Sequence, residues 1–78
     1  HKRQRQIATR IKTIETRLAR LSEKMTEAEQ ALSDPQHYSD PDSPTLQGLL
    51  RDRVSLQSQI DDFEDEWLRL ESEREGLG

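Results

Sequence analysis

Cysteine is absent from this chain, which therefore can form neither a disulfide nor a thiolate metal site. Hydrophobic residues make up only 29% of its 78 residues and charged residues 36%, so an ordinary globular core is excluded. No apolar run approaches the roughly 20 residues that cross a membrane, and no signal-peptide segment is visible. We therefore expect a protein without membrane contact, whose fold needs only a narrow apolar stripe.

Catalytic and metal-binding motifs are also missing. The chain has no glycine-rich phosphate loop, no nucleophile elbow and no metal-ligand spacing. Its imidazoles are His1 and His37, and we interpret the latter as a solvated loop residue. A run of carboxylates is interpreted as the solvated face of a helix: Asp61, Asp62, Glu64, Asp65 and Glu66. We predict that the chain is not an enzyme and holds neither a metal nor a cofactor.

Two apolar ladders of similar length are what the sequence does contain. The first has steps of four and three residues throughout: Ile7, Ile11, Ile14, Leu18, Leu21, Met25, Ala28 and Leu32. The second has one polar position, Arg53: Leu46, Leu49, Arg53, Leu56, Ile60, Phe63, Trp67 and Leu70. Such heptad seams are typical of coiled coils. We predict an all-α fold, a monomeric two-helix antiparallel coiled-coil hairpin.

The segment between the ladders marks the helix ends. Pro35 should stop the first helix, because the residue before a proline avoids the α region. Ser43 and Pro44 fit an N-cap followed by proline at the first helical position, and Asp34-Pro35 could begin a short helical turn. We expect a helix over about 3–33, a loop over about 34–43 and a helix over about 44–75, in one domain covering 1–78. Because the chain begins without methionine, we expect a fragment of a larger protein.

The ladders also predict a register. Pairing them antiparallel around a loop near residue 40 places Ile14 opposite Trp67, and it places Arg53 opposite Ala28, where its head can extend to water. The same register sets three flanking pairs, the first two of opposite charge: Arg10 with Glu73, Arg17 with Glu66, and Lys24 with Gln59.

Charge is unevenly distributed along the chain. The net charge is −4, yet residues 1–24 carry eight Lys or Arg against two Glu, whereas residues 46–78 carry four Arg against nine acidic residues. A basic helix suits phosphate contacts, which dominate nucleic-acid affinity. The candidate nucleic-acid-binding residues are Lys2, Arg3, Arg5, Arg10, Lys12, Arg17 and Arg20. Some of them could instead only complement the acidic second helix, but Lys2, Arg3 and Arg5 have few acidic partners near the C-terminus.

The whole chain resembles a known module, the C-terminal coiled-coil domain of the ABC-F ATPases of the Uup and YheS group. The resemblance rests on the basic start, the heptad helix, the loop Asp34-Pro35-Gln36-His37-Tyr38 and the late tryptophan stretch Asp65-Glu66-Trp67-Leu68-Arg69-Leu70-Glu71. In that family the loop commonly reads Asp-Pro-x-x-Tyr/Phe. A weaker resemblance is to the N-terminal helical hairpin of peptide-chain release factors, which also has a Ser-Asp-Pro-like turn.

The ABC-F resemblance implies a function. It implies a soluble cytoplasmic parent protein with two ATP-binding cassettes upstream of this piece, with ATP and Mg bound there and not in this chain. It also implies action on the translating ribosome, with the coiled coil contacting DNA or ribosomal RNA. We therefore expect a weakly nucleic-acid-contacting accessory arm of a ribosome-associated ATPase. The alternatives are a purely structural or protein-interaction hairpin and a release-factor hairpin.

Overall fold

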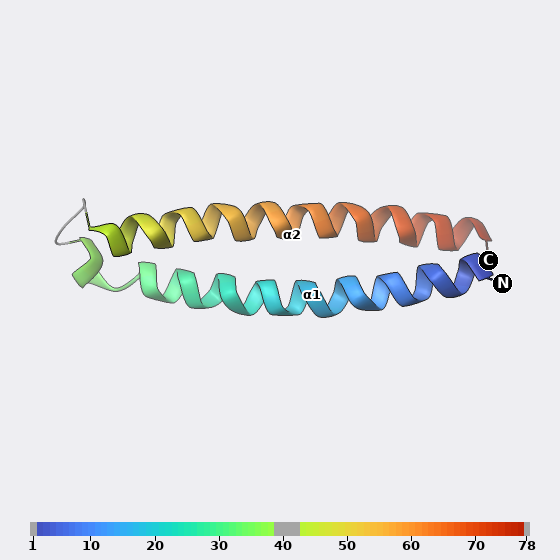
Figure 1. The fold of residues 1–78 in the computed structure, drawn as a ribbon, viewed down its shortest axis with the longest axis horizontal. Helices are drawn as coiled ribbons and strands as arrows, with labels where there is room; N and C mark the ends of the chain where they lie inside the picture. Colours follow the sequence, from blue (N-terminus) through green and yellow to red (C-terminus); the bar gives the residue numbers. More distant parts are fainter. Residues whose placement is uncertain (1, 39–42, 78) are drawn as a thin grey trace.

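The computed structural model is a two-helix antiparallel hairpin, as predicted (Figure 1). It describes residues 2–38 and 43–77. Helix α1 spans Lys2–Leu32, the 3₁₀ helix η1 spans Pro35–Tyr38, and helix α2 spans Pro44–Leu77. The two long helices lie side by side over their whole length, and both chain ends lie at the same end of the rod. The molecule measures 57 × 14 × 14 Å, so it forms an arm rather than a globule.

Local hydrogen bonds explain where the helices end. The amide of Ser33 donates to the carbonyl of Glu29, after which Asp34 accepts a 3.0 Å bond from the amide of Gln36 and so caps η1. Helix α2 starts at the proline, as predicted, and the carbonyl of Ser43 accepts the first bond, from Gln47. Helix α1 ends one residue earlier than expected and α2 runs two residues further. The loop residues 39–42 and the side chain of His37 lie outside the described part.

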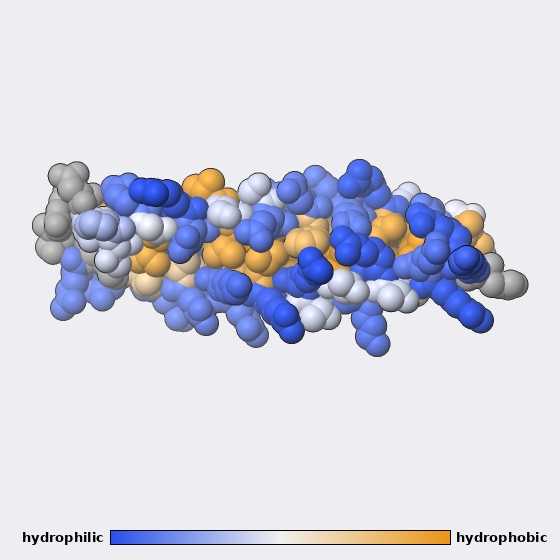
Figure 2. Space-filling model, in the orientation of Figure 1, coloured by the Kyte–Doolittle hydropathy of each residue, from blue (hydrophilic) through white to orange (hydrophobic). Residues whose placement is uncertain are grey.

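The core is a single stripe, and it is buried unequally on the two helices. Seven of the eight ladder positions of α1 are buried, with Ile7 and Ile14 completely so. The exception is Leu18, which is half-buried. On α2 only Leu46 is buried; the other apolar seam residues are half-buried. Figure 2 accordingly shows apolar surface along the line between the helices, flanked by hydrophilic side chains.

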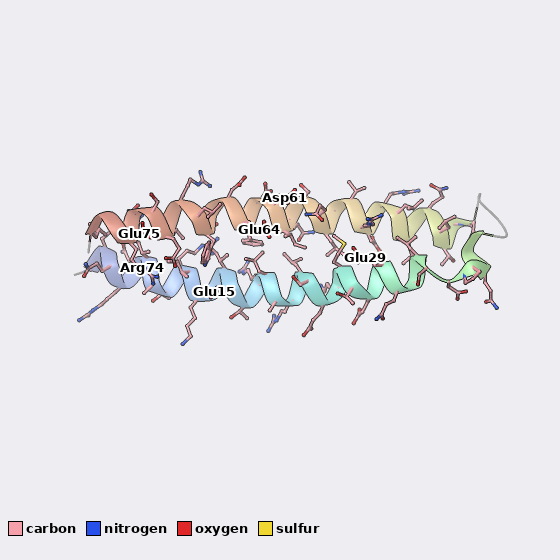
Figure 3. The ribbon with its side chains drawn as sticks, turned by 180° about the vertical axis from the view of Figure 1, so that it is seen from behind. Glu15, Glu29, Asp61, Glu64, Arg74 and Glu75 are labelled. Carbon is pink, nitrogen blue, oxygen red and sulfur yellow. The ribbon has the colours of Figure 1, made fainter. Side chains whose placement is uncertain are left out.

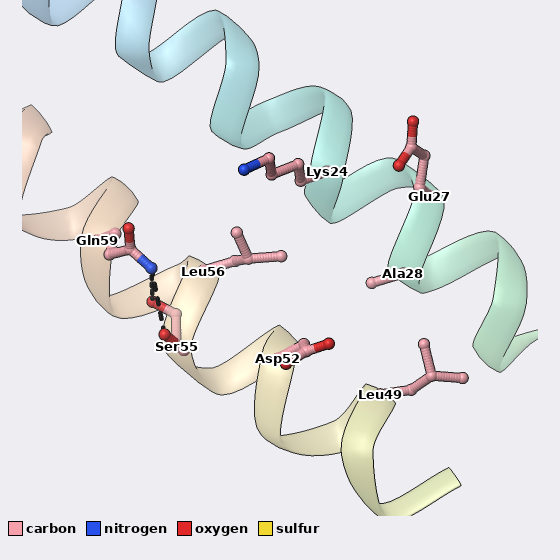
Figure 4. Close-up of a pocket in the computed structure, with 8 residues that line it drawn as sticks. All are labelled: Lys24, Glu27, Ala28, Leu49, Asp52, Ser55, Leu56 and Gln59. Carbon is pink, nitrogen blue, oxygen red and sulfur yellow. Dashed lines mark hydrogen bonds between the residues drawn. The ribbon is translucent and has the colours of Figure 1, made fainter. Parts of the chain in front are cut away.

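The Arg53 layer interrupts this stripe. Arg53 is exposed, as expected for a long side chain opposite the smallest seam residue. A depression opens there because Ala28 reaches only part of the way between Leu49 and Leu56 of α2 (Figure 4). Lys24 and Gln59 also line this depression. The predicted contact of Ile14 with Trp67 stays a prediction.

Candidate nucleic-acid interface

Two ion pairs join α1 to α2 on one flank of the hairpin. Arg10 binds Glu66 with both ends of its guanidinium, Nε to Oε2 at 2.7 Å and Nη2 to Oε1 at 2.9 Å. Arg3 binds Glu73 in the same way, with Nη2 to Oε1 at 2.9 Å. Each pair lowers the pKa of its glutamate below the usual value and raises the pKa of its arginine. The hydrogen bond between the two side chains is the largest cause, ahead of the Coulomb attraction between their charges.

These pairs correct two sequence predictions. Arg10 was expected to pair with Glu73 and Arg17 with Glu66, but each glutamate is bound by the arginine one heptad nearer the N-terminus. Arg17 instead lies with its guanidinium 5.7 Å from the centre of the Phe63 ring, within the range of a cation–π contact. Arg3, expected to have few acidic partners, therefore belongs to the interhelical pairs.

We predict that the Arg10–Glu66 pair makes stability depend on pH. The pKa of Glu66 is depressed in the folded state. The pair therefore contributes fully to the free energy of unfolding at a pH above the pKa of a glutamate in the unfolded chain, about 4.3. This contribution is lost as the pH falls through the lower folded value. Arg10→Gln should therefore lower Tm slightly at pH 7, and the difference from the parent should shrink below pH 4. Melts followed by circular dichroism would measure this.

The control for that experiment is Arg51→Gln, because Arg51 is exposed and has no described ion pair. It should leave the pH dependence unchanged. An Arg10→Gln variant whose Tm matches the parent at pH 7, or whose deficit persists at pH 3, would show that the pair does not support the hairpin.

Most of the predicted nucleic-acid-binding cations line one of two surface depressions. Lys2, Arg5 and Arg10 line a shallow depression near the N-terminus, together with polar side chains of the first three turns of α1. Arg17 and Arg20 line a second depression with Lys24, Gln59 and Phe63. We call Arg17, Arg20 and Lys24 the central basic patch. Lys12 is exposed and lines neither depression.

Lys24 was missed by the sequence analysis. The predicted register placed Lys24 opposite Gln59. Because Gln59 is uncharged, Lys24 has no acidic partner across the two helices, and this feature of the sequence could have identified it as a candidate cation. None of the three patch residues forms an ion pair within the described ranges. Glu23 and Glu27 lie within one turn of Lys24 and reduce the local positive potential.

Across residues 2–38 and 43–77, no group of three or more His, Cys, Asp or Glu side chains is arranged to hold a metal ion. Within the same ranges, neither long helix has the length and apolarity required to cross a membrane.

Comparison with known proteins gives one family. The model of the ABC transporter C-terminal domain family matches residues 2–72, which covers nearly the whole hairpin. No curated protein and no solved structure matches the chain.

Proposed function

The chain belongs to the ABC transporter C-terminal domain family, and from this membership we propose that it is the accessory arm of an ABC-F ATPase that contacts nucleic acid. By resemblance, the parent protein carries the two ATP-binding cassettes and acts on the ribosome in the cytoplasm. The arm itself makes weak contacts with the phosphates of ribosomal RNA or DNA. The family membership favours this parent over a release factor.

The central basic patch is the observation that carries the proposal. Its three cations gather on one side of a rigid helix, in a depression that also includes Gln59 and Phe63 of α2. Arg20 and Lys24 form no ion pair in the described ranges, so they can contact phosphates without first breaking one, whereas Arg17 also lies over the Phe63 ring. Arg3 and Arg10 are less suited to this role, because their charges already bind glutamates.

The acidic second helix limits the affinity. Seven Asp or Glu side chains lie between Asp61 and Glu73, and they repel a phosphate backbone. We expect binding no tighter than the roughly 10⁻⁴–10⁻⁶ M typical of non-specific contacts. Phosphate contacts carry no sequence information, so little sequence preference is expected.

A charge-reversal experiment tests the proposal. The double substitution Arg20→Glu with Lys24→Glu removes two cations of the central basic patch and leaves the interhelical ion pairs intact. We predict that it abolishes binding of a labelled RNA hairpin and of duplex DNA at low salt, measured by fluorescence anisotropy. Helicity should be retained, because neither residue is buried.

The matched control is Arg51→Glu with Arg69→Glu, which makes the same change in net charge on α2. It should weaken binding much less, because those arginines lie outside both basic depressions. Equal losses in the two double variants would show that only total charge matters. If neither nucleic acid binds the unsubstituted chain at high protein concentration, the nucleic-acid proposal fails and the alternative of a purely structural arm replaces it.

A further inference from the structure

A notch between the helices is the most apolar of the surface depressions described, and the proposed nucleic-acid contact does not use it. Its lining includes Leu18 and Ala19 of α1 and Trp67 and Leu68 of α2. Leu18 is the one seam residue of α1 that is not buried, and the small side chain of Ala19 next to it leaves the notch open. Leu68 at its edge is 59% exposed. The notch therefore presents apolar surface to the solvent.

Two glutamates line this apolar notch, one from each helix. Glu15 projects from α1 and Glu64 from α2 (Figure 3). Neither forms an ion pair in the described ranges, so two like charges border a patch of low polarity. Asp61 lies one turn from Glu64 on the same helix and adds negative charge, whereas Arg17, the nearest cation to Glu15 in the sequence of α1, lies over the Phe63 ring and does not line the notch. The local balance is acidic.

An apolar floor with an acidic rim fits one kind of side chain. Arginine and lysine place their hydrocarbon stems on apolar surface while their charged heads remain at the polar edge. A stem lying on Leu18 and Leu68 would bring the head between Glu15 and Glu64, and the half-buried Trp67 ring adds a surface that attracts cations. We propose that the notch docks a basic amphipathic protein segment, which inserts an arginine or lysine there.

A second copy of this chain fits the notch poorly. The large exposed apolar residues of the described ranges all lie on the acidic helix: Leu50, Val54, Leu68 and Leu77. The basic helix α1 therefore has charge to offer but no large exposed apolar residue to place beside it. A partner segment that combines both properties is complementary to the notch in shape and in charge. Docking at the notch is independent of the proposed nucleic-acid contact, because Glu15 and Glu64 repel phosphates and none of the central basic patch residues lines the notch.

The test uses the single tryptophan of the chain as a reporter. The probe is a synthetic amphipathic helix of leucine and arginine, ~18 residues or five turns long, compared with a peptide in which every arginine is glutamate. The arginine peptide should shift the emission of Trp67 and give a one-to-one stoichiometry by titration calorimetry. The glutamate peptide should do neither.

Two variants locate the binding. Ala19→Leu fills the notch at an exposed position, and Glu15→Lys with Glu64→Lys reverses its rim. Each should weaken the arginine peptide about tenfold or more, the first because it occupies the space of the hydrocarbon stem and the second because it replaces attraction of the charged head by repulsion. The matched reversal Glu29→Lys with Glu75→Lys lies about two helical turns beyond the lining residues, roughly 10 Å or one Debye length, and should change affinity by no more than about twofold. Circular dichroism of each variant verifies the fold.

Three results would overturn the inference. The first is equal weakening by the rim reversal and by the control reversal, which would mean non-specific attraction. The second is unchanged affinity in Ala19→Leu. The third is a shift of Trp67 emission with protein concentration in the absence of peptide, which would make a second copy the occupant.

Discussion

Ile14→Ala is expected to unfold much of the hairpin. Ile14 is fully buried at the middle of α1, so truncation leaves a cavity that two helices held together by one stripe can only partly close. Such changes cost about 2–5 kcal/mol, and a domain of this size seldom has more than about 3–5 kcal/mol of stability. A thermal melt followed by circular dichroism should show a large fall in Tm or no cooperative transition at all.

Val54→Ala is the matched control, because it removes part of an aliphatic side chain that is 71% exposed. Its effect should stay within about 0.5 kcal/mol, since surface substitutions seldom exceed that, and the better helix propensity of alanine favours a slight gain. If Ile14→Ala melted within a degree or two of Val54→Ala, the ladder of α1 would not be the core of the fold.

Thr16→Pro is expected to be as damaging, although Thr16 is exposed and contributes nothing to the core. Proline removes an amide donor within the helix and its ring clashes with the carbonyl of Lys12, at a cost of about 3 kcal/mol or more. The side-chain hydroxyl of Thr16 already bonds that same carbonyl at 3.1 Å. Because most of the stability of a helix in a protein comes from packing of its apolar face, α2 should lose much of its helicity together with α1.

Thr16→Ala separates the backbone effect from the loss of the side chain. It should be neutral or slightly stabilising, because alanine is the best helix former and a hydroxyl bonded to the preceding turn slightly destabilises a helix. Circular dichroism at 222 nm measures both variants. Loss of only about half of the helical signal in Thr16→Pro, with a stable remainder, would mean that the two helices do not form one cooperative unit.

The fold was predictable from the sequence because the spacing of apolar residues and the positions of the prolines determine local backbone structure. The uninterrupted ladder of α1 fixed the buried face of that helix, and Pro35 and Pro44 fixed its end and the start of α2 within a residue. The depth of burial was less predictable. Leu18 and Trp67 occupy seam positions, yet their side chains are only half-buried. Exposure of a seam residue also depends on the size of its neighbours, and beside these two the small Ala19 leaves an open notch.

The ion pairs were less predictable than the helices. Heptad position correctly placed Arg10, Arg17, Glu66 and Glu73 on one flank, but an arginine is long enough to reach either of two glutamates one heptad apart. In the structure Arg10 and Arg3 take Glu66 and Glu73, and the guanidinium of Arg17 lies over the Phe63 ring. Heptad spacing alone does not rank such competing contacts.

The most direct test of the account is the salt dependence of RNA binding. The logarithm of the affinity for an RNA hairpin should fall linearly with the logarithm of salt concentration, because each phosphate contact releases a counterion. The neutralising double variant Arg20→Gln with Lys24→Gln, a milder change than the charge reversal, should weaken binding without abolishing it and lower the magnitude of that slope by about two, one for each lost phosphate contact. An affinity without salt dependence, or an unchanged slope in the double variant, would contradict the claim that the central basic patch contacts nucleic acid.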